Sequence, residues 1–297
     1  MARVNMPAAE VEINEDLVRR LLQEQHPDLA AEPLRLVANG WDNVIHRLGD
    51  DLAVRMPRRR LGAELVANEH RWLPTLAERL PIPIAAPVRT GAPGLGYPWR
   101  WSICPWFEGD VAADVALADP PAEARRLGEF VAVLHTEAPA DAPVNDALRG
   151  RPVRDIRPRI EANASRLADH VPSGVAALVD ELCDVGEWTG PPVWLHGDFH
   201  TANMIVAGGS ISAVLDFGDL TSGDPACDLA IAWMLFDDEA RAVFRSAAGA
   251  GATIDDATWQ RGRVWALHFS LLYLLNSADN ERFARMGRAL VEAVVEG

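Results

Sequence analysis

The sequence predicts an α+β protein, in which a small β-rich lobe is followed by a larger, mostly helical lobe. Short apolar runs separated by turn residues fill most of the first hundred positions, and helical spacing of apolar residues dominates from Ala122 onward. The 297 residues are 49% hydrophobic, which suits a packed core. We therefore expect lobes over residues 1–104 and 105–297, with a hinge near Cys104-Pro105-Trp106.

The first lobe is expected to begin with a capped helix. Asn14 precedes Glu15, Asp16 and apolar residues at helical spacing, and the helix should end near His26-Pro27. Three antiparallel strands are expected next, a helix follows them, and two more strands flank a Gly/Pro-rich turn. In chain order, these elements are expected at residues 34–37, 44–48, 52–56, 61–80, 88 and 99–103.

The second lobe is expected to be helical around one hairpin. Helical spacing covers residues 122–135 and 155–185, with a break at Pro172, and most of 228–296. Residues 204–206 and 211–215 flank a Gly-rich turn and predict a hairpin. The longest apolar stretch, 264–275, is too short to span a bilayer and predicts a buried helix.

Composition excludes several classes of function. With 28 basic and 43 acidic residues the net charge is −15, which disfavours nucleic-acid binding. Such a field would attract a cationic substrate, or it serves solubility alone. Three dispersed cysteines argue against a disulfide scaffold or structural zinc, and the N-terminus lacks the apolar core of a signal peptide. We expect a cytoplasmic monomer or homodimer without a membrane partner.

The strongest chemical signal lies in residues 196–228. The segment HGDFHTAN places Asn203 five residues after Asp198, and a hairpin separates it from DFGD, which begins at Asp216. Phosphoryl transfer needs a carboxylate that orients the attacking hydroxyl and oxygen ligands that hold Mg²⁺. Asp198 is a candidate for the first task, and Asn203 and Asp216 are candidates for the second, because the hairpin folds the chain back on itself.

The segments HGDFHTANMIV and ISAVLDFGDLTSGDPACDLA resemble the catalytic stretch of the aminoglycoside phosphotransferase family, which includes macrolide kinases and is related to choline and protein kinases. The resemblance covers nearly the whole chain. It implies a bilobal, protein-kinase-like fold, with the nucleotide between an N-terminal nucleotide-binding lobe and a C-terminal catalytic and substrate-binding lobe. It also implies that Asp198 is the catalytic base and that Asn203 and Asp216 are the magnesium ligands.

Three further aspartates of this stretch receive roles from the same resemblance. Asp219 is expected near the metal site, where it also contacts the substrate. Asp224 and Asp228 are expected to hold the loop and to start the next helix.

The nucleotide site is expected to draw on the first lobe. The turn at residues 39–43, which ends with Asn43, occupies the place of the kinase glycine-rich loop, although it lacks GxGxxG. Arg55 stands where kinases carry a lysine, and it can hold phosphate bidentately. Its expected partner is Glu69, with Glu64 as the competing candidate. The basic run at residues 58–60 either meets the phosphates or forms a solvated loop.

The family hinge is expected at residues 101–109. There the backbone of Trp101, Ile103 and Cys104 would bind the nucleobase. Backbone contacts do not reveal the base, so Mg²⁺-ATP is the expected cofactor, and GTP is the alternative.

A metal hydrolase is the rival interpretation of the catalytic segment. In an extended chain His196, Asp198 and His200 point to one face, and such clusters bind zinc. This interpretation leaves Asn203 and DFGD unexplained. In the kinase interpretation His196 braces the loop, and His200 faces either the substrate or the solvent.

The acceptor is expected to bind to the helical lobe. The acidic residues Asp237 and Asp238 would bind the ammonium groups of an aminoglycoside, or they are an exposed helix start. A macrolide would need an apolar pocket, and the aromatic residues that either line one or pack between helices are Trp233, Trp265, Phe269 and Tyr273.

The expected function is ATP- or GTP-dependent phosphorylation of a small-molecule hydroxyl, with an aminoglycoside-type antibiotic as the first choice of acceptor. The alternatives are a macrolide kinase, a kinase of a choline-like or amino-sugar metabolite, and a silent nucleotide-binding pseudokinase. The intact set of Asp198, Asn203 and Asp216 argues against the silent module.

Overall fold

The computed structural model describes residues 7–145, 147–172, 174–250 and 254–297. The chain separates into two compact units. The first comprises Met1–Arg79, Pro83–Glu108 and Asp216–Gly218, and the second comprises Leu80–Ile82, Gly109–Leu215 and Asp219–Gly297. A sheet dominates the first unit and helices dominate the second, so the predicted α+β class is confirmed.

The first unit is built on a five-stranded antiparallel sheet with the strand order β1-β2-β3-β5-β4. All of its predicted elements are present, with boundaries shifted by a few residues. The elements are α1 (Glu15–Gln25), β1 (Leu34–Asn39), β2 (Asn43–Leu48), β3 (Leu52–Pro57), α2 (Arg60–Ala77), β4 (Arg89–Gly91) and β5 (Trp101–Pro105).

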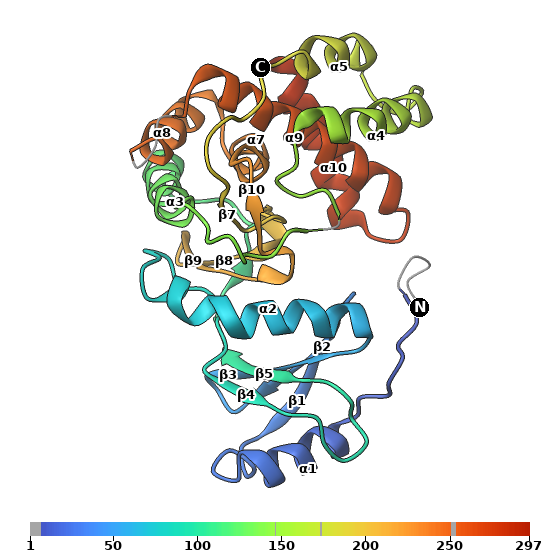
Figure 1. Ribbon diagram of the computed structural model, residues 1–297, viewed down its shortest axis with the longest axis vertical. Helices are drawn as coiled ribbons and strands as arrows, with labels where there is room; N and C mark the ends of the chain where they lie inside the picture. The colour runs from blue at the N-terminus through green and yellow to red at the C-terminus, as the bar shows by residue number, and fades with distance from the viewer. Residues whose placement is uncertain (1–6, 146, 173, 251–253) are drawn as a thin grey trace. The chain divides into compact units, whose positions relative to one another are not determined.

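The two helices of this unit cover opposite faces of the sheet (Figure 1). Successive side chains of a strand point to opposite faces. Val54 of β3 packs in the apolar cluster that includes Leu21 of α1, whereas the next residue, Arg55, bonds to Glu69 of α2. Because both faces are covered, β3 is buried along nearly its whole length.

The second unit contains two small sheets among helices. Its sheets have the orders β6-β8-β9 and β10-β7. The elements before the catalytic segment are β6 (Asp110–Val111), α3 (Pro120–Leu134), α4 (Val153–Arg166), α5 (Val175–Cys183) and β7 (Val193–Leu195). The remaining elements are η1 (Thr201–Asn203), β8 (Met204–Ala207), β9 (Ser210–Val214), η2 (Phe217–Asp219, which begins in the first unit), β10 (Thr221–Gly223), α6 (Ala226–Leu229), α7 (Ile231–Leu235), α8 (Asp238–Ala248), α9 (Asp256–Asn276) and α10 (Glu281–Glu296).

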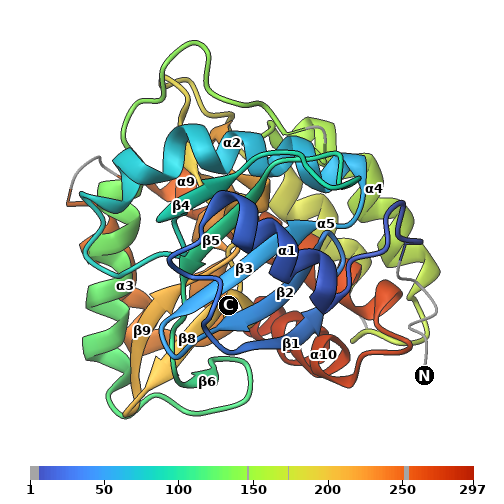
Figure 2. The ribbon, with the colours of Figure 1, turned by 90° about the horizontal axis from the view of Figure 1, so that it is seen from below.

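Helix α9 forms the centre of the second unit. It contains the apolar stretch predicted to be a buried helix, and it packs against α4, α5, α6, α7 and α10 (Figure 1). Figure 2 shows α3 beside the predicted hairpin of β8 and β9, where the Ile211 N–H donates to the Glu123 carboxylate at 2.9 Å. Among the described residues, no helix combines the length and apolarity that crossing a membrane requires.

The helix expected over residues 155–185 is two helices. The first ends at Arg166, before the predicted break at Pro172, and the second begins at Val175. Proline lacks the N–H that a continuing helix needs, and Gly174 adopts a φ of +103° that few other residues tolerate. Residues 173 and 251–253, within predicted helical stretches, and residues 1–6 of the N-terminus lie outside the described residues.

Candidate active site

The HGD segment lies in a tight turn that joins β7 to η1, and we call residues 196–201 the catalytic turn because they include the candidate base Asp198. Gly197 has a φ of +83°, and a Cβ placed on it would lie 2.2 Å from the carbonyl oxygen of Asp219. Any other residue would therefore be strained and would clash with the backbone. The glycine allows the chain to bend sharply and to present the side chain of Asp198 beyond the end of β7.

Asp228 of α6 fixes this turn by hydrogen bonds to its backbone. Its carboxylate, which is fully buried, accepts the N–H of His196 at 2.8 Å and the N–H of Gly197 at 2.9 Å. His135 contacts the same carboxylate at 3.2 Å. A charged acceptor for two backbone donors fixes the loop strongly. Nearby, Asp224 accepts the Ala226 N–H at the start of α6 at 3.0 Å.

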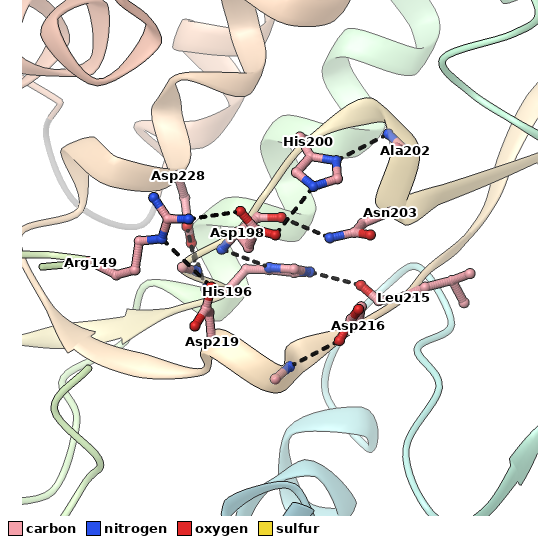
Figure 3. A network of polar contacts seen from close by, with 12 residues as sticks. Arg149, His196, Asp198, His200, Ala202, Asn203, Leu215, Asp216, Asp219 and Asp228 are labelled. Carbon is pink, nitrogen blue, oxygen red and sulfur yellow. Dashed lines mark hydrogen bonds and ion pairs between the residues drawn. The ribbon is translucent and has the colours of Figure 1, made fainter. Parts of the chain in front are cut away.

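Asp198 lies between two side-chain donors, Arg149 and His200 (Figure 3). Arg149 donates to one carboxylate oxygen at 3.1 Å, and Nε2 of His200 is 3.2 Å from the other. Burial acts to raise the pKa of Asp198, but its interactions with His200, Arg149 and His196 outweigh it, so this pKa lies well below its usual range. Asp198 is therefore ionised at neutral pH.

His200 is buried rather than exposed to solvent. Its Nδ1 accepts the Ala202 N–H at 3.2 Å, which leaves Nε2 as the nitrogen that donates to Asp198. The imidazole ring packs edge-on against Tyr273 and Phe283, with centroid distances of 5.9 and 5.6 Å. His200 thus links Asp198 to the aromatic residues of α9 and α10.

Arg149 is a candidate site residue that the sequence motifs did not reveal. Besides Asp198 it contacts Asp219 at 3.6 Å, and its guanidinium lies 4.7 Å from the ring centroid of Phe269. Its neighbours Leu148 and Gly150 both have positive φ, of 72° and 68°. A left-handed leucine is costly, so this loop holds Arg149 at the expense of local strain.

The zinc-hydrolase interpretation finds no support in the geometry of His196. Its Nε2 lies 2.9 Å from the Leu215 carbonyl oxygen and its Nδ1 accepts the Asp198 N–H at 3.3 Å, so both nitrogens are engaged. Among the described residues, no group of three or more His, Cys, Asp or Glu side chains converges as metal ligands would. His196 instead ties the catalytic turn to the end of β9.

Asn203 and Asp216 carry the oxygen donors that Mg²⁺ prefers. Nδ2 of Asn203 donates to the Asp198 carbonyl at 3.0 Å, and its Oδ1 accepts no hydrogen bond from another described residue. Asp216 has a φ of 57°, and its side chain is 59% exposed. Because Mg²⁺ typically uses one or two protein oxygens together with phosphates and water, each of these side chains is of a chemical type that suits the ion.

In the first unit, Arg55 forms a bidentate pair with Glu69. The two nitrogen–oxygen distances are 3.1 and 3.2 Å, and both side chains are buried. Burial acts to lower the pKa of Arg55, but Glu69, Cys104 and Asp216 more than offset this, so Arg55 stays charged. The competing residue, Glu64, is on the surface and pairs with Arg60 at 2.7 Å.

The family model of the phosphotransferase enzyme family (APH) matches residues 33–265. The chain belongs to this family. The match covers most of the sequence and includes both Arg55 and the catalytic segment. The predicted resemblance is confirmed, and so is the enzyme class, a phosphotransferase. No curated protein matches the chain significantly.

Solved structures show that this family member shares the phosphotransferase fold. Aminoglycoside 2'-phosphotransferase-IIIa, solved as its GDP complex, has a TM-score of 0.70 at 16% identity, covering 96% of this chain and 99% of that one. Macrolide 2'-phosphotransferase MphH from Brachybacterium faecium has a TM-score of 0.60 at 24% identity, covering 93% and 98%. A streptomycin–ATP ternary complex of APH(2")-IIa has a TM-score of 0.60 at 18% identity, covering 95% and 99%.

The turn expected to cover the phosphates is braced by the basic run that follows β3. Arg58 donates to the Gly40 carbonyl at 3.1 Å, and Arg59 binds Asp42 at 2.7 Å. Both arginines therefore have structural partners within the unit. The buried Oδ1 of Asn43 has no hydrogen-bond partner among the described residues, so Asn43 retains an uncommitted polar atom beside this turn.

The expected hinge residues lie in β5, an inner strand of the sheet. The side chains of Trp101, Ile103 and Cys104 are buried, and Trp101 donates to the Ala92 carbonyl at 3.2 Å. The Ile103 carbonyl accepts the Val88 N–H at 2.8 Å. Any contact of these residues with a nucleobase would be made by backbone atoms, and this role stays a prediction.

The acidic residues expected to bind an acceptor have structural partners. Asp237 caps α8 by accepting the Ala240 N–H at 3.0 Å, and Asp238 pairs with Arg241 at 2.7 Å. Asp219 accepts the Asn145 side-chain amide at 2.7 Å. Their predicted role in substrate binding stays a prediction, but none of the three carboxylates is free of a partner.

Proposed function

We propose that this phosphotransferase transfers the γ-phosphate of ATP or GTP to a hydroxyl group of a small molecule. The observation that carries the proposal is the environment of Asp198. Its carboxylate is ionised, oriented by Arg149 and His200, and presented by a turn that Asp228 holds rigidly. Such a carboxylate is suited to accept a hydrogen bond from an alcohol and to aim its oxygen at phosphorus.

The remaining roles follow from the chemistry of the donors. Arg55, aligned by Glu69, binds the α- and β-phosphates, and Asn43 contributes a polar contact beside them. Asn203 and Asp216 hold Mg²⁺, which neutralises phosphate charge when it is bound. The nucleobase is bound through the backbone near Cys104.

In the proposed step the acceptor oxygen attacks the γ-phosphorus as the bond to the bridging oxygen breaks. The nucleoside diphosphate leaves, and the hydroxyl proton passes to Asp198 and then to solvent. Because the pKa of Asp198 is low, it is a weak base, and its main contribution is to orient the hydroxyl. This fits a loose transition state, in which the acceptor loses its proton late.

Exchange of Asp198 tests the proposal. Asp198→Asn keeps the shape of the side chain but removes its charge, so turnover should fall by about 10²–10⁴-fold while nucleotide affinity stays nearly constant. Nucleoside-diphosphate release is measured with ATP and GTP against aminoglycosides, macrolides and small amino-alcohols, and nucleotide binding is measured by calorimetry.

The matched control is Asp169→Asn, which makes the same change at an exposed position of the same unit. It should behave as the wild type does. Turnover of Asp198→Asn equal to that of the wild type would contradict the assigned role, and failure of the wild type to bind magnesium nucleotide would contradict the proposed function itself.

A further inference from the structure

A cavity of about 310 Å³ lies wholly within the second unit, next to the catalytic turn. Its walls come from the segment after β6 and from η1, α7, α9 and α10. The apolar side chains that line it include Met234, Leu235, Met286 and Leu290. Its size is at the lower end of the range for small-ligand sites, which are typically apolar with a few placed polar groups.

Two contacts connect this cavity to Asp198. Thr201, three residues after Asp198, lines it directly, and so does Tyr273. The ring of Tyr273 packs edge-on against His200, which bonds to the Asp198 carboxylate. A molecule seated in the cavity therefore lies against residues of the catalytic turn.

The hydroxyl of Tyr273 is an unused polar atom at this position. The residue is 9% exposed, and its hydroxyl has no hydrogen-bond partner among the described residues. Burial, and then the nearby charge of Asp198, raise the pKa of this hydroxyl. A buried hydroxyl without a partner is costly, and an oxygen of a bound molecule would satisfy it.

The charges around the cavity do not suit a polycation. Arg285 is the only charged residue among the described residues that line the cavity. Arg285 binds Asp114 at 2.6 Å, and Arg282 binds the other oxygen of the same carboxylate. The nearby acidic group is thus already neutralised by two arginines, and an ammonium group would meet cations instead of free carboxylates.

We propose that this cavity binds the apolar part of the acceptor and that the acceptor is an alcohol on a largely uncharged body, one of whose oxygens bonds to Tyr273. This inference rests on the proposed function and narrows its acceptor class. The polar face of such a molecule extends toward Asp198, and its apolar face contacts Met234 and Met286.

The test uses three acceptor probes with the full-length protein and magnesium ATP or GTP. Erythromycin is an apolar lactone with one amine, kanamycin is a polycation, and choline is a small cation. Release of nucleoside diphosphate gives the KM of each probe, and tryptophan fluorescence gives its affinity without turnover. We expect erythromycin to stimulate release and kanamycin and choline to have no effect.

Two variants, Met286→Glu and Tyr273→Phe, and one control, Val295→Glu, connect the measured KM and Kd to the cavity. Met286→Glu places a carboxylate in the apolar wall and should raise the KM and Kd for erythromycin at least about tenfold. Val295→Glu adds the same charge at an exposed position of α10 that does not line the cavity, and it should change neither. Tyr273→Phe removes one neutral hydrogen bond and should raise the KM for erythromycin about three- to tenfold, with the KM for nucleotide unchanged.

Stimulation of release by kanamycin or choline, without stimulation by erythromycin, would overturn the inference. An erythromycin KM that is the same in Met286→Glu and in the wild type would also overturn it, and so would failure of all three probes to bind. None of these results would contradict the proposed phosphotransfer, provided that the wild type binds magnesium nucleotide in calorimetry. Loss of nucleotide binding would instead contradict the proposed function.

Discussion

Asp198 shows how individual contacts tune a candidate catalytic group. Burial alone would favour its neutral form, yet the donors Arg149 and His200 keep it ionised. Each donor is itself fixed, because Arg149 lies over Phe269 and His200 accepts the Ala202 N–H. A carboxylate with its lone pairs directed in this way is preorganised for an incoming hydroxyl.

Removing Arg149 should alter the pH dependence of the reaction. Arg149→Met deletes a cation that lowers the pKa of Asp198, so this pKa should rise toward its usual value. A depressed pKa keeps the carboxylate ionised down to low pH, and the acidic limb of the kcat/KM profile should therefore move to higher pH in the variant. The measurement is kcat/KM for the acceptor across the acidic range.

Arg151→Met is the control, because Arg151 is a half-exposed neighbour that pairs with Asp155 instead. Its pH profile should match the wild type. If both variants lost stability and activity together without any shift of the acidic limb, Arg149 would have a purely structural role.

At the scale of elements, the candidate catalytic residues depend on short segments that packing holds in place. Strand β7 has three residues and pairs with β10 through Leu195 and Thr221. Helix α6 has four residues, and its position is set by Asp224 and Asp228. Such short elements are not stable alone. Strand β7 is held by its pairing with β10, and α6 is connected to the catalytic turn by the buried carboxylate of Asp228.

Helix α1 allows a direct test of local capping. Oδ1 of Asn14 accepts the Leu17 N–H at 3.0 Å at an exposed position. Asn14→Ala should lower the free energy of unfolding by about 1 kcal/mol, whereas Asn14→Ser, which retains a capping oxygen, should lower it by much less. Urea denaturation measures both. An equal loss in the two variants would show that the cap contributes little.

At the scale of the whole molecule, the net charge and the local charges near the cavity predict different acceptors. The chain carries a net charge of −15, which by itself predicts attraction of cations. The carboxylates near the candidate acceptor cavity are nevertheless paired, as Asp114 is with Arg282 and Arg285. Screening limits the reach of distant charges to about 8–10 Å at physiological salt, so these local pairs dominate.

Nucleotide binding should stabilise the whole protein in a way that depends on Asp216. Magnesium ATP at 100 times its Kd adds about 2.7 kcal/mol to the stability of the bound protein, which corresponds to a rise of several degrees in Tm. Asp216→Ala should abolish the magnesium-dependent part of that rise, which is measured against the same variant without nucleotide because alanine is disfavoured at the φ of 57° found here. Differential scanning calorimetry with and without magnesium measures it.

Asp169→Ala, at an exposed position of the second unit, serves as the control and should retain the full rise. An unchanged magnesium effect in Asp216→Ala would exclude this residue as a ligand of the ion.

The sequence by itself determined the fold class, the order of the main elements and the enzyme family. Apolar periodicity and turn residues are local signals, and they placed α1, the first three strands and the β8–β9 hairpin within a few residues. The spacing of Asp198, Asn203 and Asp216 is also a local signal, because only a short hairpin separates the segment HGDFHTAN from the segment DFGD. The split of residues 155–185 into two helices was placed less accurately, because the first helix ends before its breaking proline.

Only the tertiary structure decided which side chains meet. Arg149 contacts Asp198 across 49 positions and Asp219 across 70, and no local pattern marks an arginine in an irregular loop. The choice of Glu69 over Glu64, the burial of His200 and the pairing of Asp114 likewise depend on how helices pack. These contacts join residues that lie far apart in the sequence. They depend on how the folded elements pack, and the residue types and spacing of a short segment do not specify that packing.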